Sequence, residues 1–463
     1  MALTVSVDAI VQGNRTPALG VRPHWKRIRL REVASVLNGF AFKSAQFTKG
    51  DGMPLIRIRD VGSDSTDTNY VGEFDERYIV EPGDLLVGMD GDFNCARWRG
   101  PRGLLNQRVC KVTVHVEQYH PRFLDFALPG YLKAINDATS SVTVKHLSSR
   151  TIEDIPLPFP PLSEQEEIVA ELEKQFSRLD EAVANLKRVK ANLKRYKAAV
   201  RRAAVEGRLV PTEAELARRE RRSYEDARAL LDRVQRERRS DWAGKAAYCE
   251  PAEAADGWAP SLAEGWALAS LEALTSANRV ICYGILMPKE NVSDGVLYVK
   301  VRDMKDDTID VASLHRTSAA IAAKYTRASL RTGDVLLSIR GTYGRVALVP
   351  PVLDGGNITQ DTARLAITPS VCKEFVVVYL RSEHAQRYFK AVARGVAVKG
   401  VNIGDVRPMP VPVPPLAEQR RIVDEVARRL SLVREVEIEV DWNLARATAL
   451  RARVLQSFFA CGI

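Results

Sequence analysis

Residues 156–169 read PLPFPPLSEQEEIV, and they open the stretch on which the fold depends. After the proline pair, residues 162–206 contain neither proline nor glycine, so one long helix is predicted. Ser163, with Glu166 three residues later, has the pattern of a capping box, and we expect the helix to begin there. At about 1.5 Å per residue the helix would span on the order of 65 Å, which is too long for the interior of a compact domain.

Apolar residues recur along this helix at alternating spacings of three and four, the heptad pattern of a coiled coil. They are Val169, Leu172, Phe176, Leu179, Val183, Leu186, Leu193 and Val200. Val189 and Tyr196 widen the apolar face beyond what one partner helix would cover. An isolated helix would leave this stripe in water, so the pattern predicts a partner helix and a further docking surface.

The same motif returns as PVPVPPLAEQRRIV at residues 410–423, an offset of 254 residues from Pro156 to Pro410. The heptad pattern continues at that offset. Its apolar positions are Val423, Val426, Leu430, Val433, Val440 and Leu444. A proline pair, a Glu-Gln and a heptad register that repeat together predict a second long helix, which pairs with the first.

The segments before the two motifs repeat as well. A Gly-Asp pair precedes a predicted strand at Asp84 and again at Asp334, and a glutamine precedes another strand at Gln107 and at Gln360. The predicted fold class is therefore α+β, with two similar mixed α/β domains separated by two long helices. The predicted boundaries are a leader at 1–21, a first domain at 22–158, a central helix at 159–210, a charged helical linker at 211–261, a second domain at 262–412 and a distal helix at 413–463.

The connections of the second domain constrain the topology. This domain starts soon after the first long helix ends and finishes where the second begins, so both connections lie at one end of the coil. The helices are then predicted to be antiparallel, with the domains at opposite ends and a pseudo-twofold axis between them. Two-fold proteins that read DNA address half-sites at a fixed spacing, and one chain of this kind would read two different half-sites.

Local patterns predict single elements within this plan. They are strands over 54–61 and 298–304, helices over 121–138 and 373–392, and an exposed linker helix over 213–239. The dipeptide Val144-Lys145 matches Val398-Lys399 at the same offset of 254 from residue 144 to residue 398.

The composition is that of a soluble globular protein with a basic balance. The chain has 463 residues, 46% hydrophobic composition and a net charge of +10, which favours an anionic partner. The six cysteines stand singly, without the spacings of zinc ligands or a disulfide framework. No window approaches the roughly 18 consecutive apolar residues of a membrane span. We therefore predict a cytoplasmic protein with reduced thiols and no metal site.

Motifs of the common catalytic classes are absent from the sequence. It contains no G-x-x-x-x-G-K-[ST], no G-x-S-x-G and no H-E-x-x-H. The two proline pairs lack the preceding Asn or Asp and the following aromatic residue of an amino-methyltransferase motif. The sequence therefore predicts a chain that is not an enzyme.

The loops after the two Gly-Asp strands carry residue types that read DNA. Residues 88–100 and 338–345 combine glycines, which allow close backbone approach, with arginines, which can bond guanine through two donors. Asn and Gln can bond adenine, and lysines can contact phosphate. The candidates are Arg57, Arg59, Asn94, Arg97, Arg99, Asn106, Gln107, Lys145, Arg302, Arg340, Tyr343, Arg345, Gln360, Lys399 and Asn402. Ordinary surface loops with solvated arginines are the alternative interpretation.

A basic stripe also runs along the first predicted helix. It consists of Lys187, Arg188, Lys194, Arg195, Arg201 and Arg202, at the e and f positions of the heptads. The stripe could face DNA between the half-sites or an acidic partner, although a solvated coil face is the commoner explanation.

This arrangement resembles the DNA-specificity (S) subunit of type I restriction-modification enzymes. The resemblance rests on two variable domains, each followed by the proline and Glu-Gln motif and a long helix. It extends to AVEGRLV at 204–210 and to LAEGW at 262–266, and it covers residues 22–463. Ala417, where the first copy has Ser163, and the ending at 458–463 depart from the family pattern.

The resemblance implies a reader of DNA without catalysis of its own. Each target recognition domain would read one half of a bipartite DNA site, and the helices would set the gap and dock two methyltransferase subunits that use S-adenosylmethionine. Restriction subunits that use ATP with Mg²⁺ can join such a complex, and no cofactor is expected in this chain. A specificity subunit for a methyltransferase alone, or a coiled-coil scaffold that binds proteins, is the alternative.

Overall fold

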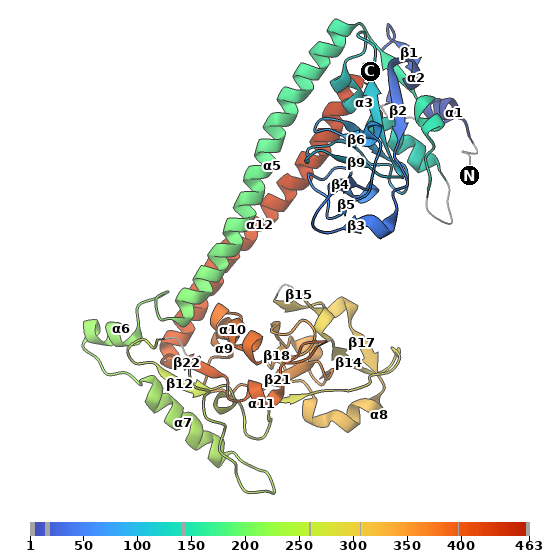
Figure 1. Cartoon of the computed structure of the whole chain (residues 1–463). Helices are drawn as coiled ribbons and strands as arrows, with labels where there is room; N and C mark the ends of the chain where they lie inside the picture. The colour runs from blue at the N-terminus through green and yellow to red at the C-terminus, as the bar shows by residue number, and fades with distance from the viewer. Residues whose placement is uncertain are drawn as a thin grey trace. The chain divides into compact units, whose positions relative to one another are not determined.

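The computed structural model describes residues 5–13, 19–139, 145–258, 261–305, 307–396 and 398–459. The chain forms two compact units (Figure 1). The first unit comprises Met1–Lys187 with Asp441–Ile463, and the second comprises Arg188–Val440. Two long helices, α5 (Leu162–Val205) and α12 (Leu416–Phe459), contribute to both units. Within the described ranges no helix combines the length and apolar character that crossing a bilayer requires.

Two small sheets and a strand pair build the first unit. The sheet orders are β2–β10–β7–β8, which is antiparallel, and β3–β5–β4–β9–β6, while β1 pairs with β11. The strands are β1 (Lys26–Arg29), β2 (Ala34–Asn38), β3 (Phe47–Thr48), β4 (Met53–Ile56), β5 (Asn69–Tyr70), β6 (Ile79–Val80), β7 (Leu85–Gly88), β8 (Cys95–Arg97), β9 (Gly103–Leu105), β10 (Val109–Val114) and β11 (Pro156–Phe159). The shorter helices are α1 (Val7–Gly13), α2 (Leu30–Val33), α3 (Pro121–Ala138) and α4 (Ser149–Glu153).

The second unit repeats the antiparallel sheet and the strand pair. Its sheets are β13–β21–β18–β19, β17–β14–β20 and β15–β16, and β12 pairs with β22. The strands are β12 (Ala267–Ser270), β13 (Cys282–Tyr283), β14 (Val296–Val299), β15 (Met304–Lys305), β16 (Thr308–Ile309), β17 (His315–Thr317), β18 (Val335–Ser338), β19 (Val346–Leu348), β20 (Asn357–Ile358), β21 (Thr362–Leu365) and β22 (Pro410–Val413). The helices are α6 (Glu213–Glu220), α7 (Ala227–Ser240), α8 (Ala319–Ala322), α9 (Lys373–Leu380), α10 (Glu383–Val392) and α11 (Ile403–Val406).

The repeat extends to strand register. Leu85 of β7 lies opposite Val112 of β10, and Val335 of β18 lies opposite Leu365 of β21. Each unit also has a parallel strand pair, β4 with β9 in the first and β14 with β20 in the second. Along the chain, β9 directly precedes β10 and β20 directly precedes β21. The predicted fold class, two similar mixed α/β domains with two long helices, is confirmed.

The two long helices pack against each other with opposite directions in each unit. In the first unit Asp180 of α5 pairs with Arg451 of α12 at 2.5 Å, and Phe459 joins the core that contains Leu172. In the second unit Lys197 of α5 pairs with Glu437 of α12 at 2.7 Å. Higher numbers on α5 thus meet lower numbers on α12 within each unit, which confirms the antiparallel coiled coil.

The predicted heptad positions are buried or half-buried, and on α12 the half-buried ones are Val423, Leu430 and Leu444. On α12 a seam at intervals of seven, Val426, Val433, Val440 and Ala447, has at most 8% of each side chain exposed. On α5 the two ends of the seam are buried and its middle is half-buried. The buried residues are Val169, Leu172, Phe176 and Val200, and the half-buried ones are Leu179, Val183, Leu186 and Leu193.

Two predictions about helix ends are wrong. Helix α5 begins at Leu162, so Ser163 lies inside its first turn and does not cap it. The linker helix predicted over 213–239 is two helices, α6 and α7. Arg221 ends α6 in a left-handed conformation with φ 50°, and Asp226 caps α7 by accepting from the backbone of Ala229.

Three further elements are shorter than predicted. The helix over 373–392 divides into α9 and α10, because Ser382 caps the second helix at the backbone of Ala385. The strands over 54–61 and 298–304 end early, at Ile56 and Val299. In both cases a 3-10 turn follows, Ile58–Asp60 or Val301–Asp303, and its aspartate accepts from the backbone three residues earlier at 2.9 or 2.8 Å.

The helix over 121–138 is α3 and is confirmed. Val144 of the repeated Val-Lys dipeptide and the closing residues 460–463 lie outside the described residues.

Candidate nucleic-acid interface

The glutamate of the repeated motif ties the first domain to α5. Glu164 accepts hydrogen bonds from the indole nitrogen of Trp25 at 3.0 Å and from Arg22 at 2.8 Å, and the ring of His24 lies at 3.1 Å. Burial alone would raise the pKa of Glu164, but the bonds from Trp25 and His24 and the charge of Arg22 outweigh it and lower the pKa. The carboxylate therefore stays charged at the joint.

The glutamine of the motif secures the loop before α3. Gln165 is fully buried, and its Oε1 accepts from the backbone N–H of His120 at 2.7 Å. Its Nε2 donates to the carbonyl oxygens of Gln118 at 3.0 Å and Pro160 at 2.9 Å. One buried amide thus pairs three backbone groups around the start of the helix.

The second unit repeats both contacts. Glu418 accepts from the indole of Trp266 at 2.9 Å, and burial raises the pKa of Glu418. Gln419 accepts from the backbone of Cys372 at 2.9 Å and donates to the carbonyl of Pro414 at 2.7 Å. The Glu-Gln pair is therefore a joint between each domain and its helix, a role that the sequence analysis did not assign to it.

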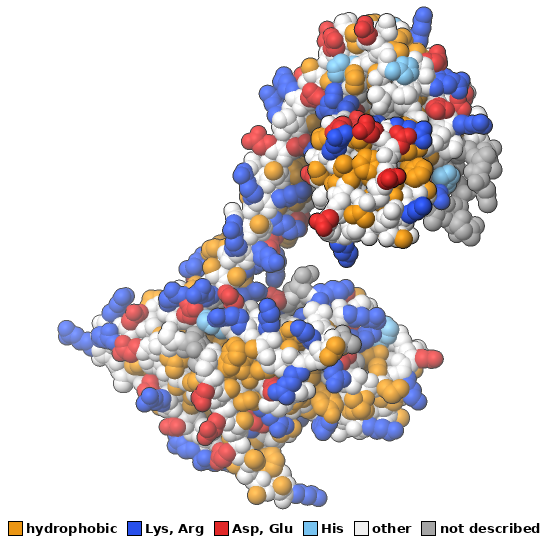
Figure 2. All heavy atoms as spheres, in the orientation of Figure 1, with side chains coloured by type: hydrophobic (Ala, Val, Ile, Leu, Met, Phe, Trp, Pro, Cys, Tyr) orange, Lys and Arg blue, Asp and Glu red, His pale blue; other side chains and the backbone are white. Residues whose placement is uncertain are grey.

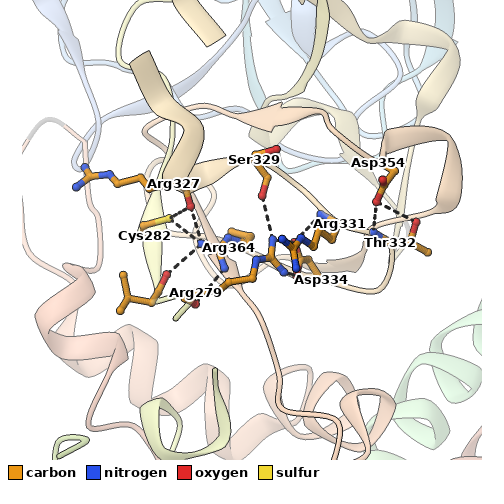
Figure 3. A network of polar contacts seen from close by, with 10 residues as sticks. Arg279, Cys282, Arg327, Ser329, Arg331, Thr332, Asp334, Asp354 and Arg364 are labelled. Atoms are coloured by element: carbon orange, nitrogen blue, oxygen red, sulfur yellow. Dashed lines mark hydrogen bonds and ion pairs between the residues drawn. The ribbon is translucent and has the colours of Figure 1, made fainter. Parts of the chain in front are cut away.

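The repeated Gly-Asp pair is a structural turn. Asp334 accepts from the backbone of Arg331 at 2.8 Å, as Asp84 does from the backbone of Glu81 at 2.9 Å. Arg279 holds Asp334 through two bonds of 2.6 and 2.7 Å (Figure 3). The turn sets the start of the strand that leads to the candidate loops.

A buried arginine braces the same sheet. Arg364 of β21 has 1% of its side chain exposed and donates to the carbonyls of Arg279, Val280 and Arg327 at 3.0, 3.2 and 2.7 Å (Figure 3). Burial lowers its pKa. Lys111 takes the equivalent position in β10 of the first unit. Both cations hold strands together, and Arg364 is closed to a ligand.

Five candidate residues of the second unit line two hollows that share Arg340. Arg302, Arg340 and Arg345 line a hollow of about 640 Å³. Arg340 also borders a hollow of about 180 Å³, together with Gln360 and Asn402. The structure therefore brings together residues that are up to a hundred positions apart, and it presents three guanidinium groups and two amides on one surface.

The other candidates of this unit are placed differently. Tyr343 packs partly against the core, while Lys399 is exposed and its carbonyl accepts from the backbone of Gly341 at 3.0 Å. The Arg345 side chain already makes a contact within the domain, because its Nη1 donates to the carbonyl of Met304 at 2.8 Å.

Three candidates of the first unit are engaged or buried inside their domain. Arg97 bonds Asp125 of α3 at 2.5 Å, and Lys145 donates to the carbonyl of Asn136 at 2.6 Å. Asn106 is buried, with 7% of its side chain exposed. Arg97 and Lys145 are thus engaged within the domain, although Arg97 also lines a hollow of about 410 Å³ with Arg99. The remaining candidates are more accessible: Arg59, Asn94, Arg99 and Gln107 are exposed, and Arg57 is half-buried.

A charged cluster that the sequence analysis missed lies beside Gln107. The Asp90 carboxylate is 2.6 Å from Nδ1 of His146 and 3.4 Å from Arg108. The side chains of Arg108 and His146 are 55% and 43% exposed. An alignment of the two repeats at Gln107 and Gln360 could have indicated this cluster, because a charged residue follows the glutamine in both copies, Arg108 in the first and Asp361 in the second.

Part of the basic stripe on α5 faces the second domain. Arg201 pairs with Asp307 at 2.6 Å and lines a hollow of about 500 Å³ with Lys305 and Arg381. Arg202 pairs with Glu206 at 2.9 Å. Lys and Arg side chains are also spread over the surface of the second unit (Figure 2). The unit thus carries positive charge beside the hollows.

The long helices expose apolar side chains that their own pairing does not cover. In the second unit Leu432, Val436 and Ile438 of α12 are 52%, 44% and 65% exposed, and Val189 and Tyr196 of α5 are 39% and 44% exposed. The widened apolar face predicted for α5 is present.

A family model described as "Type I restriction modification DNA specificity domain" matches residues 23–195 and 293–428. The chain belongs to the type I restriction-modification specificity family. The resemblance based on the repeated motif is thereby confirmed.

Two relatives and one solved structure are similar to this chain. It is 36% identical over 463 residues to the EcoBI specificity subunit of Escherichia coli, covering 99% of this chain and 90% of the relative. It is 26% identical over 175 residues to the Escherichia coli EcoAI specificity subunit, covering 32% of this chain and 28% of that one. A structure from work on assembly and conformational transition of the type I system covers 95% of this chain and 98% of its own, with a TM-score of 0.61 and 17% identity. The chain is thus a specificity subunit of a type I restriction-modification system.

Proposed function

We propose that each domain of this specificity subunit reads one half of an asymmetric, bipartite DNA site. The observation that carries the proposal is the pair of hollows in the second domain that share Arg340, one lined by Arg302 and Arg345 and the other by Gln360 and Asn402. Guanidinium and amide groups are the side chains that read guanine and adenine in the major groove. The first domain has the same frame with different side chains, as a reader of a different half-site would.

The coiled coil acts as a spacer and as a docking surface in this proposal. Its buried seam joins two helices of the same chain, so the separation between the domains is set within one molecule. The exposed Leu432, Val436 and Ile438 would be covered by methyltransferase subunits, because an apolar stripe on a rod is a favourable surface for another helix.

The chain itself would contribute recognition and no chemistry. Two methyltransferase subunits would bring S-adenosylmethionine, and restriction subunits, when they join, would use ATP and Mg²⁺. Sequence motifs for these cofactors are absent from the chain. Recognition, methylation and restriction would all act on the same cytoplasmic DNA.

Methylation mapping tests the proposal. Host DNA is sequenced for modified bases with and without this gene, in the presence of the methyltransferase gene. We expect one motif with two defined blocks around an undefined gap, lost on deletion. A single uninterrupted motif, or a motif that survives deletion, would contradict the proposal. Salt-insensitive association of the assembled complex with DNA would instead favour a protein-binding scaffold.

A further inference from the structure

Backbone hydrogen bonds make two positions of the first domain equivalent to two of the second. The amide of Met89 donates to the carbonyl of Arg108 at 2.8 Å, and the amide of Ile339 donates to the carbonyl of Asp361 at the same distance. Gly88 of β7 lies opposite Val109, as Ser338 of β18 lies opposite Thr362. Asp90 therefore corresponds to Arg340, and Arg108 corresponds to Asp361.

The frame around these positions is conserved between the units. The amide of Leu147 donates to Met89 at 2.7 Å, and the amide of Val401 donates to Ile339 at 2.7 Å. The amide of Gly91 donates to Lys145 at 3.0 Å, as that of Gly341 does to Lys399. These backbone hydrogen bonds are thus repeated in both units, although the positive φ of Arg108 is not repeated at Asp361.

At these positions the charges are reversed. The first domain has a carboxylate at 90 and a guanidinium at 108, whereas the second has a guanidinium at 340 and a carboxylate at 361. A pair kept only for stability would form the same contact in either order. Asp90 and Arg108 do approach within 3.4 Å, but the exposed Arg340 side chain makes no hydrogen bond or ion pair with any residue that the structure describes.

The conformation and surroundings of the pairs also indicate a ligand. Arg108 has φ 72°, a left-handed conformation that is unfavourable for a long side chain and is found preferentially at functional sites. Its side chain is 55% exposed. Arg340 and Asp361 line the hollow of about 640 Å³, and Arg340 also borders the smaller hollow with Gln360. Both pairs therefore stand where a base edge could reach them.

We propose that Asp90 with Arg108, and Arg340 with Asp361, are the base-discriminating pairs of the two half-sites. This inference rests on the proposed function. Arg340 would donate two hydrogen bonds to O6 and N7 of a guanine. Asp90 would accept from the exocyclic amine of a cytosine or an adenine, with its carboxylate held by His146 at 2.6 Å. The reversed charges give the two domains different base preferences within the same frame of backbone hydrogen bonds.

Charge exchange within each pair is the direct test. The double substitution Asp90→Arg with Arg108→Asp gives the first domain the charge order of the second and leaves its net charge unchanged. Arg340→Asp with Asp361→Arg does the reverse. Each variant is assembled with the methyltransferase subunits, and its preferred sequence is determined from a randomised duplex library. We expect a changed base at one position of one block, with the other block and the salt dependence of binding unchanged.

A conservative variant keeps the test decisive if an exchange does not fold. Arg340→Lys retains the charge but loses the two-donor fork, so base preference at one position should fall on the order of 10- to 100-fold. Arg228→Lys on α7, which lines neither of the two hollows, is the matched control and should leave the motif unchanged. An unaltered preference in Arg340→Lys, or a uniform loss of affinity for all sequences, overturns the inference. A wild-type motif without two blocks would instead refute the proposed function itself.

Discussion

Trp266 donates its indole N–H to Oε1 of Glu418 across 2.9 Å, and both side chains are buried. Trp266→Phe would leave that carboxylate oxygen without its donor, at a cost of about 1–3 kcal/mol in unfolding free energy. Trp25→Phe is the matched control, because both tryptophans are 6% exposed and lose the same volume. Glu164 keeps Arg22 and His24, so the control should cost less. Urea denaturation of both variants measures the difference, and equal losses would contradict it.

The two glutamates of the joints should respond to pH in opposite directions. Burial raises the pKa of Glu418 above its ordinary 4.5, so its contribution to stability is full below pH 4.5 and is lost as the pH rises through the raised pKa. The pKa of Glu164 is lowered, so its contribution is present above pH 4.5 and is lost as the pH falls through the lowered pKa.

Substitution by glutamine separates these effects. Relative to wild type, Glu418→Gln should gain stability as the pH rises above 4.5, on top of a constant loss from its altered hydrogen bonds. Relative to wild type, Glu164→Gln should lose stability as the pH rises from the lowered pKa to 4.5, because the wild-type contribution appears over that range. Chemical denaturation at a series of pH values checks both slopes. Parallel pH profiles for the two variants would show that the joints are electrostatically alike.

Neighbouring residues on α12 should separate folding from partner docking. Val433 is 4% exposed in the seam, so Val433→Ser should lower the unfolding free energy by about 1.5–3 kcal/mol. Leu432 and Ile438 are 52% and 65% exposed, so Leu432→Ser with Ile438→Ser should change stability by less than about 1 kcal/mol. If methyltransferase covers them, the dissociation constant for that subunit should rise at least about 10-fold. Calorimetric titration measures this dissociation constant, and an unchanged value would show that the methyltransferase docks on another surface.

Arg364 should be more important for stability than its counterpart in the first unit. Replacement by leucine removes the guanidinium donor from three carbonyls, of which that of Arg327 keeps the Cys282 thiol, at about 1–3 kcal/mol for each group that stays unpaired. Lys111→Leu is the control, since Lys111 is 18% exposed and water can reach its site. Hydrogen exchange of β18 and β21, which reports the second unit alone, should accelerate in Arg364→Leu.

The repeat made the fold predictable, because a proline pair, a Glu-Gln and a heptad register recur together. What the pattern could not show is the partner of each side chain. Arg97 and Lys145 have the composition of DNA contacts, yet Asp125 and Asn136 bind them in the folded domain. Such contacts depend on tertiary packing between residues that are distant in the sequence.

Other features were present in the sequence but carried no local signal. The break between α6 and α7 contains neither glycine nor proline, so composition alone favoured one helix. The reversed pair at Arg108 and Asp361 becomes visible only when the repeats are aligned residue by residue. The Glu-Gln pair repeats as part of the motif, but nothing in the motif shows that its side chains bond the preceding domain.

The joints also define where a domain can be exchanged. Strands β12 and β22 and the Trp266–Glu418 contact form the base of the second domain, so a replacement confined to residues 275–405 leaves them intact. We expect a chimera with residues 275–405 from a homologue to fold, to retain the methyltransferase and to change one block of the methylated motif. The reciprocal exchange of the first domain, with Trp25 and β11 kept, should change the other block. Methylation mapping of both chimeras decides the matter, because a change in both blocks after a single exchange would mean that the two domains do not read independently.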